Sequence, residues 1–393
     1  MTSFDAIILG AGGAGLMCAA IAGQRGRRVL LIDHADQAGK KILISGGGRC
    51  NFTNIHAAPD RYLSANPHFM KSALRRYTAQ DFIDLVNRHR IAWHEKTLGQ
   101  LFCDGSARQI VHMLMEECAK GAVRISLGRP IHEVEHADGL FRVGYGDEVA
   151  SAPALVIATG GPSIPKMGAT GFAYDLARKF GLKVVEPRPA LVPLTLGGDE
   201  VLFRSLSGVA TDVVAKSGKA QFREAALFTH KGLSGPAILQ ISSYWRHGQP
   251  IGIDFLPDRE PTWPVEAKRA RPRTHFHTLL TEALPDRLAE TLAKRIGLWG
   301  ELANLPDRKL KEAGRQLADW RFSPNGTEGF AKAEVTAGGI STDGLSSQTM
   351  EAKNVSGLYV IGEAVDVTGW LGGYNFQWAW SSGWAAAQAL PGG

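Results

Sequence analysis

A glycine turn near the amino terminus has the residue types and spacing of a dinucleotide site. The turn is formed by Gly10, Ala11, Gly12, Gly13, Ala14 and Gly15. In such turns the first glycine permits the tight bend, the second lets a pyrophosphate reach the backbone, and the third lets helix and strand pack closely. Apolar runs at 5–9 and 29–32 flank the turn, and Asp33 ends the second run, where its carboxylate can accept hydrogen bonds from a ribose. The sequence therefore predicts a strand, a helix over 16–22 and a second strand around a bound dinucleotide. The alternative is a glycine turn without a ligand.

A second glycine-rich segment follows at 39–54. Three consecutive glycines stand among Arg, Cys and Asn residues, a combination that packing does not explain but that exposes backbone N–H groups to a flat or anionic ligand. The cofactor contacts expected here are Lys41, Ser45, Gly46, Gly47, Gly48, Arg49, Cys50 and Asn51. Cys50 is also a candidate catalytic residue near the reacting ring. A flexible surface loop is the alternative.

Two later apolar runs also end on glycine. The run at 154–157 leads into Ala158, Thr159 and Gly160, which brings backbone close to a cofactor on the first turn. The run at 357–361 leads into the further expected cofactor contacts Gly362, Glu363, Asp366, Gly372, Gly373, Tyr374, Asn375 and Gln377. Asp366 is expected to bind a ribityl chain, and a helix from near Asn375 to stabilise negative charge on a reduced flavin. Dehydrogenases that use only a nicotinamide do not need this return to the first turn, so FAD is the preferred cofactor.

The pattern changes between Pro189 and Phe330. Short alternating segments at 191–255 predict a small antiparallel sheet or barrel, and 275–319 predicts two or three amphipathic helices. Between them, 257–272 reads as a proline-bearing linker, and its basic residues favour a solvated face over RNA contact. We interpret the region as an insertion, because an apolar run that ends on glycine, like those before the region, occurs again at 357–361.

His230 is the candidate catalytic side chain of this middle region. It follows a strand end at 227–228, and Ser234 is expected to cap the next helix. His230 can act as a proton donor or a substrate ligand, but a structural histidine held by hydrogen bonds is the commoner case.

Composition limits the remaining classes of protein. Four cysteines among 393 residues (Cys18, Cys50, Cys103 and Cys118) form no CxxC pair and no metal-ligand spacing, which predicts no metal site and a reducing, cytoplasmic location. Residues 6–23 carry no charge, but five glycines interrupt them and Asp5 precedes them, so no membrane anchor is expected. The net charge of +6 allows a polyanionic partner without requiring one, and the sequence does not fix the oligomeric state.

Three motifs together resemble one family. Segments 46–54, 228–236 and 372–379 are similar to those of the YhiN-like (BaiN/RdsA-type) flavoproteins. The resemblance implies an α/β fold with a glutathione-reductase-like, Rossmann-type FAD-binding domain split into 1–189 and 323–393. It also implies an inserted β-barrel-like domain at 190–257 and a small helical domain at 258–322.

The resemblance further implies a flavin-dependent reductase of activated C=C bonds. The leading hypothesis is that NAD(P)H acts as a transient donor and reduces FAD, which then passes hydride to a small-molecule alkene. One alternative is reduction of a uridine base in ribosomal RNA. Others are a flavin-binding interaction or sensor protein without turnover, and an oxidase or hydroxylase.

Overall fold

A five-stranded parallel sheet surrounds the first glycine turn in the computed structural model, which describes residues 2–392. Four of its five strands are short apolar runs whose residues are all buried, as expected where both faces are covered, and the edge strand at 124–126 is more polar and more exposed. Their order in space is β22 (Leu358–Val360), β12 (Ala154–Ile157), β2 (Ala6–Leu9), β3 (Val29–Ile32) and β8 (Arg124–Ser126). Neighbouring strands run parallel, so their carboxyl ends meet at one edge.

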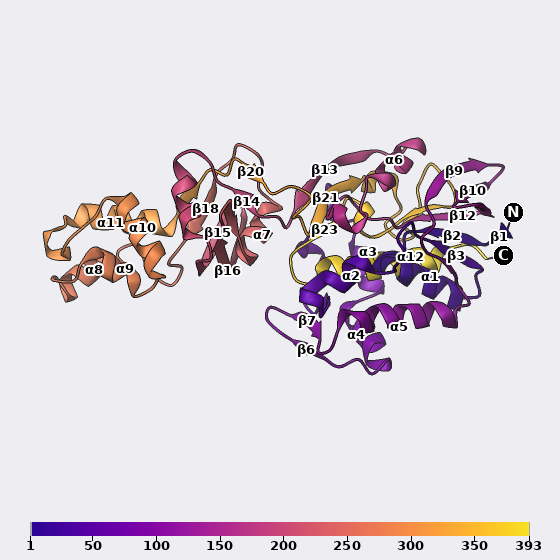
Figure 1. The fold of residues 1–393 in the computed structure, drawn as a ribbon, viewed down its shortest axis with the longest axis horizontal. Helices are drawn as coiled ribbons and strands as arrows, with labels where there is room; N and C mark the ends of the chain where they lie inside the picture. The colour runs from indigo at the N-terminus through magenta and orange to yellow at the C-terminus, as the bar shows by residue number, and fades with distance from the viewer. Residues whose placement is uncertain (1, 393) are drawn as a thin grey trace. The chain divides into compact units, whose positions relative to one another are not determined.

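Long helices cover this sheet. Helix α1 (Gly13–Gln24) lies against both α12 (Tyr374–Ala389) and α5 (Ala107–Lys120) (Figure 1). The α1–α12 contact is close because Gly383 has no side chain: a Cβ there would lie 2.6 Å from the Ala14 carbonyl oxygen. The last helix of the chain therefore packs on the first.

The remaining elements of this unit are smaller. Two further sheets have the orders β1-β11-β10-β9 and β4-β7-β6, and two strand pairs are β13-β21 and β23-β5. The strands are β1 (Thr2–Ser3), β4 (Asn51–Asn54), β5 (Tyr62–Leu63), β6 (Trp93–Glu95), β7 (Gln100–Cys103), β9 (Ile131–Ala137), β10 (Leu140–Tyr145), β11 (Glu148–Ala152), β13 (Val184–Ala190), β21 (Val335–Ile340) and β23 (Thr368–Gly369). The helices are α2 (Lys40–Ile44), α3 (Lys71–Arg76), α4 (Ala79–Arg88) and α6 (Phe172–Lys179).

The chain divides into two compact units. The first contains residues up to Arg188 and the chain from Val335 onward, and the second is Pro189–Glu334. In the second unit an antiparallel sheet has the order β19 (Trp320–Phe322), β18 (Ile251–Asp254), β15 (Ala210–Ser217), β16 (Ala220–Phe228), β17 (Gly232–Ser234), β14 (Leu194–Thr195) and β20 (Gly326–Thr327). Its helices are α7 (Pro236–Ser242), α8 (Trp263–Ala270), α9 (Phe276–Thr281), α10 (Asp286–Ile296) and α11 (Asp307–Ala318). The predicted division of this insertion into a barrel-like and a helical domain stays a prediction, as do its boundaries.

Some local expectations were wrong. The expected linker at 257–272 contains α8, because Pro264 lies in the first turn, where a proline needs no partner for its missing N–H. Ser234 does not cap a helix: it ends β17, and Gly235, with φ +85°, occupies the cap position of α7. The first helix is longer than 16–22, because the glycines at both ends of that stretch are helical.

Candidate functional site

The three glycines of the first turn have different surroundings. Gly10 has φ +106°, and a Cβ there would lie 2.6 Å from the Ala158 carbonyl oxygen. A Cβ on Gly15 would overlap the Gly10 carbonyl oxygen, whereas one on Gly12 would meet no protein atom within 4 Å. Gly10 and Gly15 therefore permit close packing, and Gly12 borders open space at the amino end of α1. This is where a helix presents unpaired N–H groups to an anion.

The Asp33 side chain stabilises the same turn by hydrogen bonds. Its Oδ2 accepts a hydrogen bond from the Ala11 N–H at 2.6 Å, and its Oδ1 accepts one from the Ala35 N–H at 2.8 Å. Its side chain is 15% exposed, which leaves part of the carboxylate accessible. The predicted ribose contact stays a prediction.

The second glycine-rich segment forms a short helix and a left-handed bend. Residues Gly46, Gly47 and Gly48 have φ values of 56°, 66° and 86°, so three successive residues lie in the region that favours glycine. A Cβ at Gly47 or Gly48 would meet nothing within 4 Å. The backbone of this bend is therefore open on one side, as expected for contact with a ligand.

Lys41 connects this segment to the residues that follow β12 and β22. Its Nζ donates to Ser163 Oγ at 2.6 Å and lies 2.8 Å from Glu363 Oε2. Glu363 Oε1 accepts hydrogen bonds from Ser163 Oγ at 2.8 Å and from the Thr336 N–H at 3.0 Å. Burial raises the pKa of Glu363, but the Lys41 charge and these hydrogen bonds outweigh it and hold the pKa below its ordinary value. The pair is thus an ionised bridge across the carboxyl edge of the sheet.

Buried hydroxyl groups beside this bridge lack partners. Thr159 Oγ1, Tyr174 Oη and Thr336 Oγ1 accept and donate no hydrogen bond within residues 2–392. The last two face the same place, since a Cβ on Gly161 would lie 2.8 Å from Tyr174 Oη and 2.7 Å from Thr336 Oγ1. Burial raises the pKa of the Tyr174 phenol, and the Glu363 and Asp366 carboxylates raise it further, so the phenol remains a donor. Such groups are expected to bond a ligand or water.

Tyr174 and Thr336 were missed by the sequence reasoning. Tyr174 lies in α6 and Thr336 in β21, two elements that the sequence reasoning did not link to the cofactor, and only the fold brings both hydroxyls to Gly161.

The carboxyl-terminal glycine turn fastens onto the amino-terminal part of the chain. Asn54 Nδ2 donates to the Gly372 carbonyl oxygen at 2.8 Å, and a Cβ on Gly373 would overlap the Thr53 carbonyl oxygen. Gln377 is fully buried and bonds Thr53 Oγ1 at 2.6 Å, while Asn375 bonds the Gly369 backbone. These amide side chains hold the turn, so their predicted role as direct cofactor ligands stays a prediction, as does that of Tyr374.

Three other predicted residues are placed as follows. Asp366 is buried and accepts a hydrogen bond from the Ala65 N–H at 3.0 Å, and burial raises its pKa. Cys50 is fully buried in the first unit, and burial raises the pKa of its thiol, which favours a packing role. His230 is exposed between β16 and β17 of the second unit. The catalytic roles of His230 and Cys50 stay predictions.

The carboxyl edge of the sheet fits an FAD molecule. The open space at Gly12 and the open bend at Gly47 and Gly48 lie in one unit and expose backbone that would suit phosphate contacts. Lys41 adds a positive charge at the same edge, held by Glu363. We propose this edge as the cofactor site.

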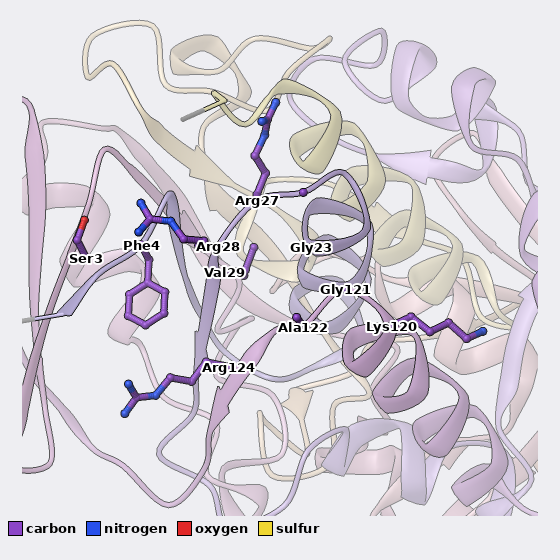
Figure 2. Close-up of a pocket in the computed structure, with 11 residues that line it drawn as sticks. Ser3, Phe4, Gly23, Arg27, Arg28, Val29, Lys120, Gly121, Ala122 and Arg124 are labelled. Atoms are coloured by element: carbon purple, nitrogen blue, oxygen red, sulfur yellow. The ribbon is translucent and has the colours of Figure 1, made fainter.

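A separate hollow lies at the opposite, amino end of the strands. Figure 2 shows its lining, which includes the start of β3 and the end of α1, with Arg28, Lys120 and Arg124 among its side chains. Each of these cations has a carboxylate partner: Asp5, Glu117 and Glu148 respectively. Arg27 also lines the hollow and forms no ion pair within residues 2–392, so three of the four positive charges are paired.

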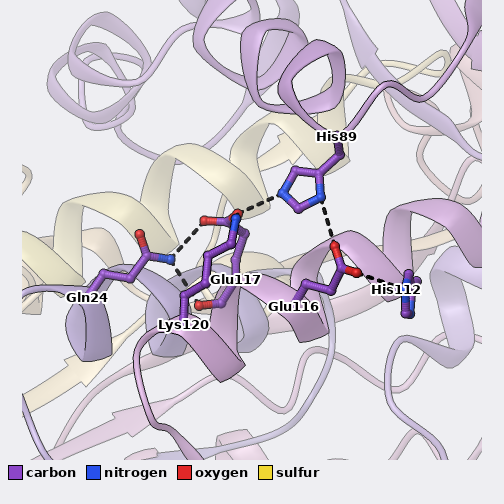
Figure 3. A network of polar contacts seen from close by, with 6 residues as sticks. All are labelled: Gln24, His89, His112, Glu116, Glu117 and Lys120. Carbon is purple, nitrogen blue, oxygen red and sulfur yellow. Dashed lines mark hydrogen bonds and ion pairs between the residues drawn. The ribbon is translucent and has the colours of Figure 1, made fainter.

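A polar network ties α1, α4 and α5 together behind the sheet (Figure 3). His89 Nε2 lies 2.7 Å from Glu117 Oε1, and His89 Nδ1 lies 3.0 Å from Glu116 Oε2. Gln24 Nε2 and Lys120 Nζ donate to Glu117 at 2.8 and 2.6 Å. Only a doubly protonated imidazole donates to both carboxylates. The network is structural in character, and no three His, Cys, Asp or Glu residues within 2–392 are arranged to hold a metal ion.

The fold and this site define a Rossmann-type flavoenzyme. Of the solved structures, 3-ketosteroid-Δ4-(5α)-dehydrogenase from Rhodococcus jostii RHA1, in complex with 4-androstene-3,17-dione, has the same fold with a TM-score of 0.52. The two sequences are 13% identical, and the match covers 98% of this chain and 97% of that one.

The chain belongs to the family described as HI0933-like protein Rossmann domain, whose model matches residues 4–389. It is 53% identical to the ribosomal RNA dihydrouridine synthase of Escherichia coli K12 over 99% of this chain and 98% of that protein. It is 29% identical to the 3-dehydro-bile acid Δ(4,6)-reductase of Clostridium scindens over 97% of this chain and 98% of that protein. The predicted family, the Rossmann-type FAD-binding fold and the class of FAD-dependent oxidoreductase are confirmed. Within residues 2–392, no helix has the length and apolar character needed to span a membrane.

Proposed function

We propose that this protein reduces a uridine base of ribosomal RNA to dihydrouridine. The observation that carries the proposal is the 53% identity with a ribosomal RNA dihydrouridine synthase along nearly the whole of both chains. Uridine contains a C5=C6 bond conjugated to the C4 carbonyl, so it is an activated alkene of the kind the motifs suggest. The sequence analysis gave a small-molecule alkene as the leading substrate and uridine as an alternative. We now prefer uridine.

The reaction balances with a pyridine nucleotide as donor. Uridine, NAD(P)H and one proton give dihydrouridine and NAD(P)⁺, with hydride added at C6 and the proton at C5. FAD, when bound, supplies the hydride-transfer chemistry between donor and alkene. The chain's own residues would hold it: the amino end of α1 would bind the pyrophosphate, and the Lys41–Glu363 bridge would fix the carboxyl edge of the sheet beside it. An activity on ribosomal RNA implies a cytoplasmic location.

Anaerobic turnover with purified holoenzyme tests the proposal. In vitro transcribed, unmodified ribosomal RNA is incubated with NADH or NADPH, digested to nucleosides and analysed by mass spectrometry for the 2 Da gain of dihydrouridine. We expect dihydrouridine only when enzyme, donor and RNA are all present. Reduction of the flavin without any dihydrouridine, on RNA that retains its native fold, would contradict the proposal.

A second candidate function is reduction of a small conjugated enone. The 29% identity with a bile acid reductase over 97% of this chain favours it. A steroid 4-en-3-one added to the same anaerobic reaction separates the two, because reoxidation of the flavin by the enone, with RNA inert, selects the small-molecule substrate.

A further inference from the structure

The helices of the second unit carry most of the chain's net positive charge. We call residues 263–318, which contain α8 to α11, the helical module. Eleven Lys and Arg residues stand there against seven Asp and Glu, an excess of four in a chain whose total is +6. Part of this charge is paired, as in Arg271 with Glu282 at 2.6 Å and Lys268 with Asp307 at 2.9 Å. The excess lies on a surface that no function described so far uses.

Trp299 is exposed on this module. Its exposed fraction is 50%, whereas the other eight tryptophans of the chain are buried or half-buried. It stands on the loop that follows Gly297 at the end of α10, and the adjacent Leu298 is buried and anchors the loop. Tryptophan is enriched at interfaces because its ring combines a large apolar area with a polar N–H.

Backbone hydrogen bonds bring a basic segment beside this loop. The Phe276 N–H donates to the Gly300 carbonyl oxygen at 3.0 Å, and the Leu302 N–H donates to the Thr274 carbonyl oxygen at 2.9 Å. The exposed residue Arg273 lies in the segment that these bonds hold. Unlike Arg271, Arg273 forms no ion pair within residues 2–392. A free guanidinium and an exposed indole therefore lie on two segments that are bonded to each other.

This combination matches single-stranded nucleic acid. Bases stack on exposed aromatic rings, and arginine contacts the phosphates between them. We propose that Trp299 and Arg273 form a docking surface on the helical module for a single-stranded segment of ribosomal RNA, an inference that rests on the proposed function. A second copy of this chain is the rival occupant, but a symmetric contact through this face would set like charges opposite each other.

RNA binding by single variants tests the surface. The holoenzyme is titrated into labelled, in vitro transcribed ribosomal RNA at several KCl concentrations. We expect Trp299→Ala to weaken binding by about 5- to 30-fold at fixed salt, and Trp299→Phe to restore most of it. Arg273→Gln should reduce the slope of log affinity against log salt by about 0.7 to 1. The matched control is Arg142→Gln on β10, because Arg142 is exposed and forms no ion pair within residues 2–392. This substitution should change neither the RNA affinity nor its salt dependence.

The outcomes separate this surface from the proposed function. FAD content and melting temperature establish that each variant is folded. If the wild-type protein forms dihydrouridine and Trp299→Ala binds RNA as tightly as the wild type, the surface is wrong and the function stands. If Trp299→Ala weakens RNA binding but the wild type forms no dihydrouridine, the function is wrong and the surface stands. A change in oligomeric state by light scattering, with RNA affinity unchanged, assigns Trp299 to a second copy and overturns the surface.

Discussion

Two glycines of the first turn are expected to have different roles: Gly12 in cofactor binding and Gly15 in packing of the fold. Gly12 has φ −78° and ψ −175°, which an alanine adopts without strain, and its missing Cβ faces open space. Gly15 stands where a Cβ would overlap the Gly10 carbonyl oxygen, which fixes how closely α1 approaches β2. One methyl group is therefore expected to have different effects at two positions only three residues apart.

We expect Gly12→Ala to keep the wild-type apoprotein stability and to weaken FAD binding by at least about tenfold, because the new methyl group occupies the phosphate space. Gly15→Ala should destabilise the apoprotein by about 3 kcal/mol, because the helix must move away from the strand. Thermal unfolding of both apoproteins and titration with FAD measure the two effects. Equal destabilisation by both substitutions would mean that Gly12 is also a packing position.

At the scale of elements, the network of Figure 3 couples three helices through one carboxylate. Burial raises the pKa of Glu117, but hydrogen bonds from Lys120, Gln24 and His89 outweigh it and lower the pKa to about 2, from an ordinary value of 4.5. A carboxylate with a depressed folded-state pKa contributes stability above its unfolded pKa. That contribution is lost as pH falls through the folded value.

Glu117→Gln should therefore cost about 1–3 kcal/mol at pH 7, and the difference from wild type should shrink between pH 4.5 and 2. Urea unfolding across this pH range measures it. Glu290→Gln, which removes an exposed carboxylate paired with Lys294 on α10, is the control and should change stability little. A difference for Glu117→Gln that stays constant down to pH 2 would show that the carboxylate charge does not hold these helices together.

At the scale of the whole molecule, the two proposed ligands should protect different segments from hydrogen exchange. Bound FAD should slow exchange at 10–15, 46–50 and 159–161, because these backbones line the assigned site. A ribosomal RNA transcript should slow it at 297–303. The hairpin at 131–145 serves as the unprotected reference. Exchange at 46–50 that is unaffected by FAD would remove the glycine bend from the cofactor site.

The sequence alone determined the features set by short-range chemistry. The spacing from Gly10 to Asp33 predicts strand, turn, helix and strand because each glycine answers a local steric need, and the structure has these elements as β2, α1 and β3. The three family motifs likewise identified a Rossmann-type flavoenzyme, because such motifs are contiguous in the chain.

The tertiary structure decided everything that depends on distant residues meeting. The sequence predicts Gln377 as a cofactor ligand, which stays a prediction, whereas only the fold shows that its side chain is buried and bonded to Thr53. Tyr174 and Thr336 were not singled out in the sequence, and become candidates only because two separate elements bring both hydroxyls to Gly161. Trp299 likewise looks like any core tryptophan until the fold leaves it exposed. The physical reason is the same in each case: hydrogen bonding and burial are properties of the folded neighbourhood, and residue spacing along the chain does not specify that neighbourhood.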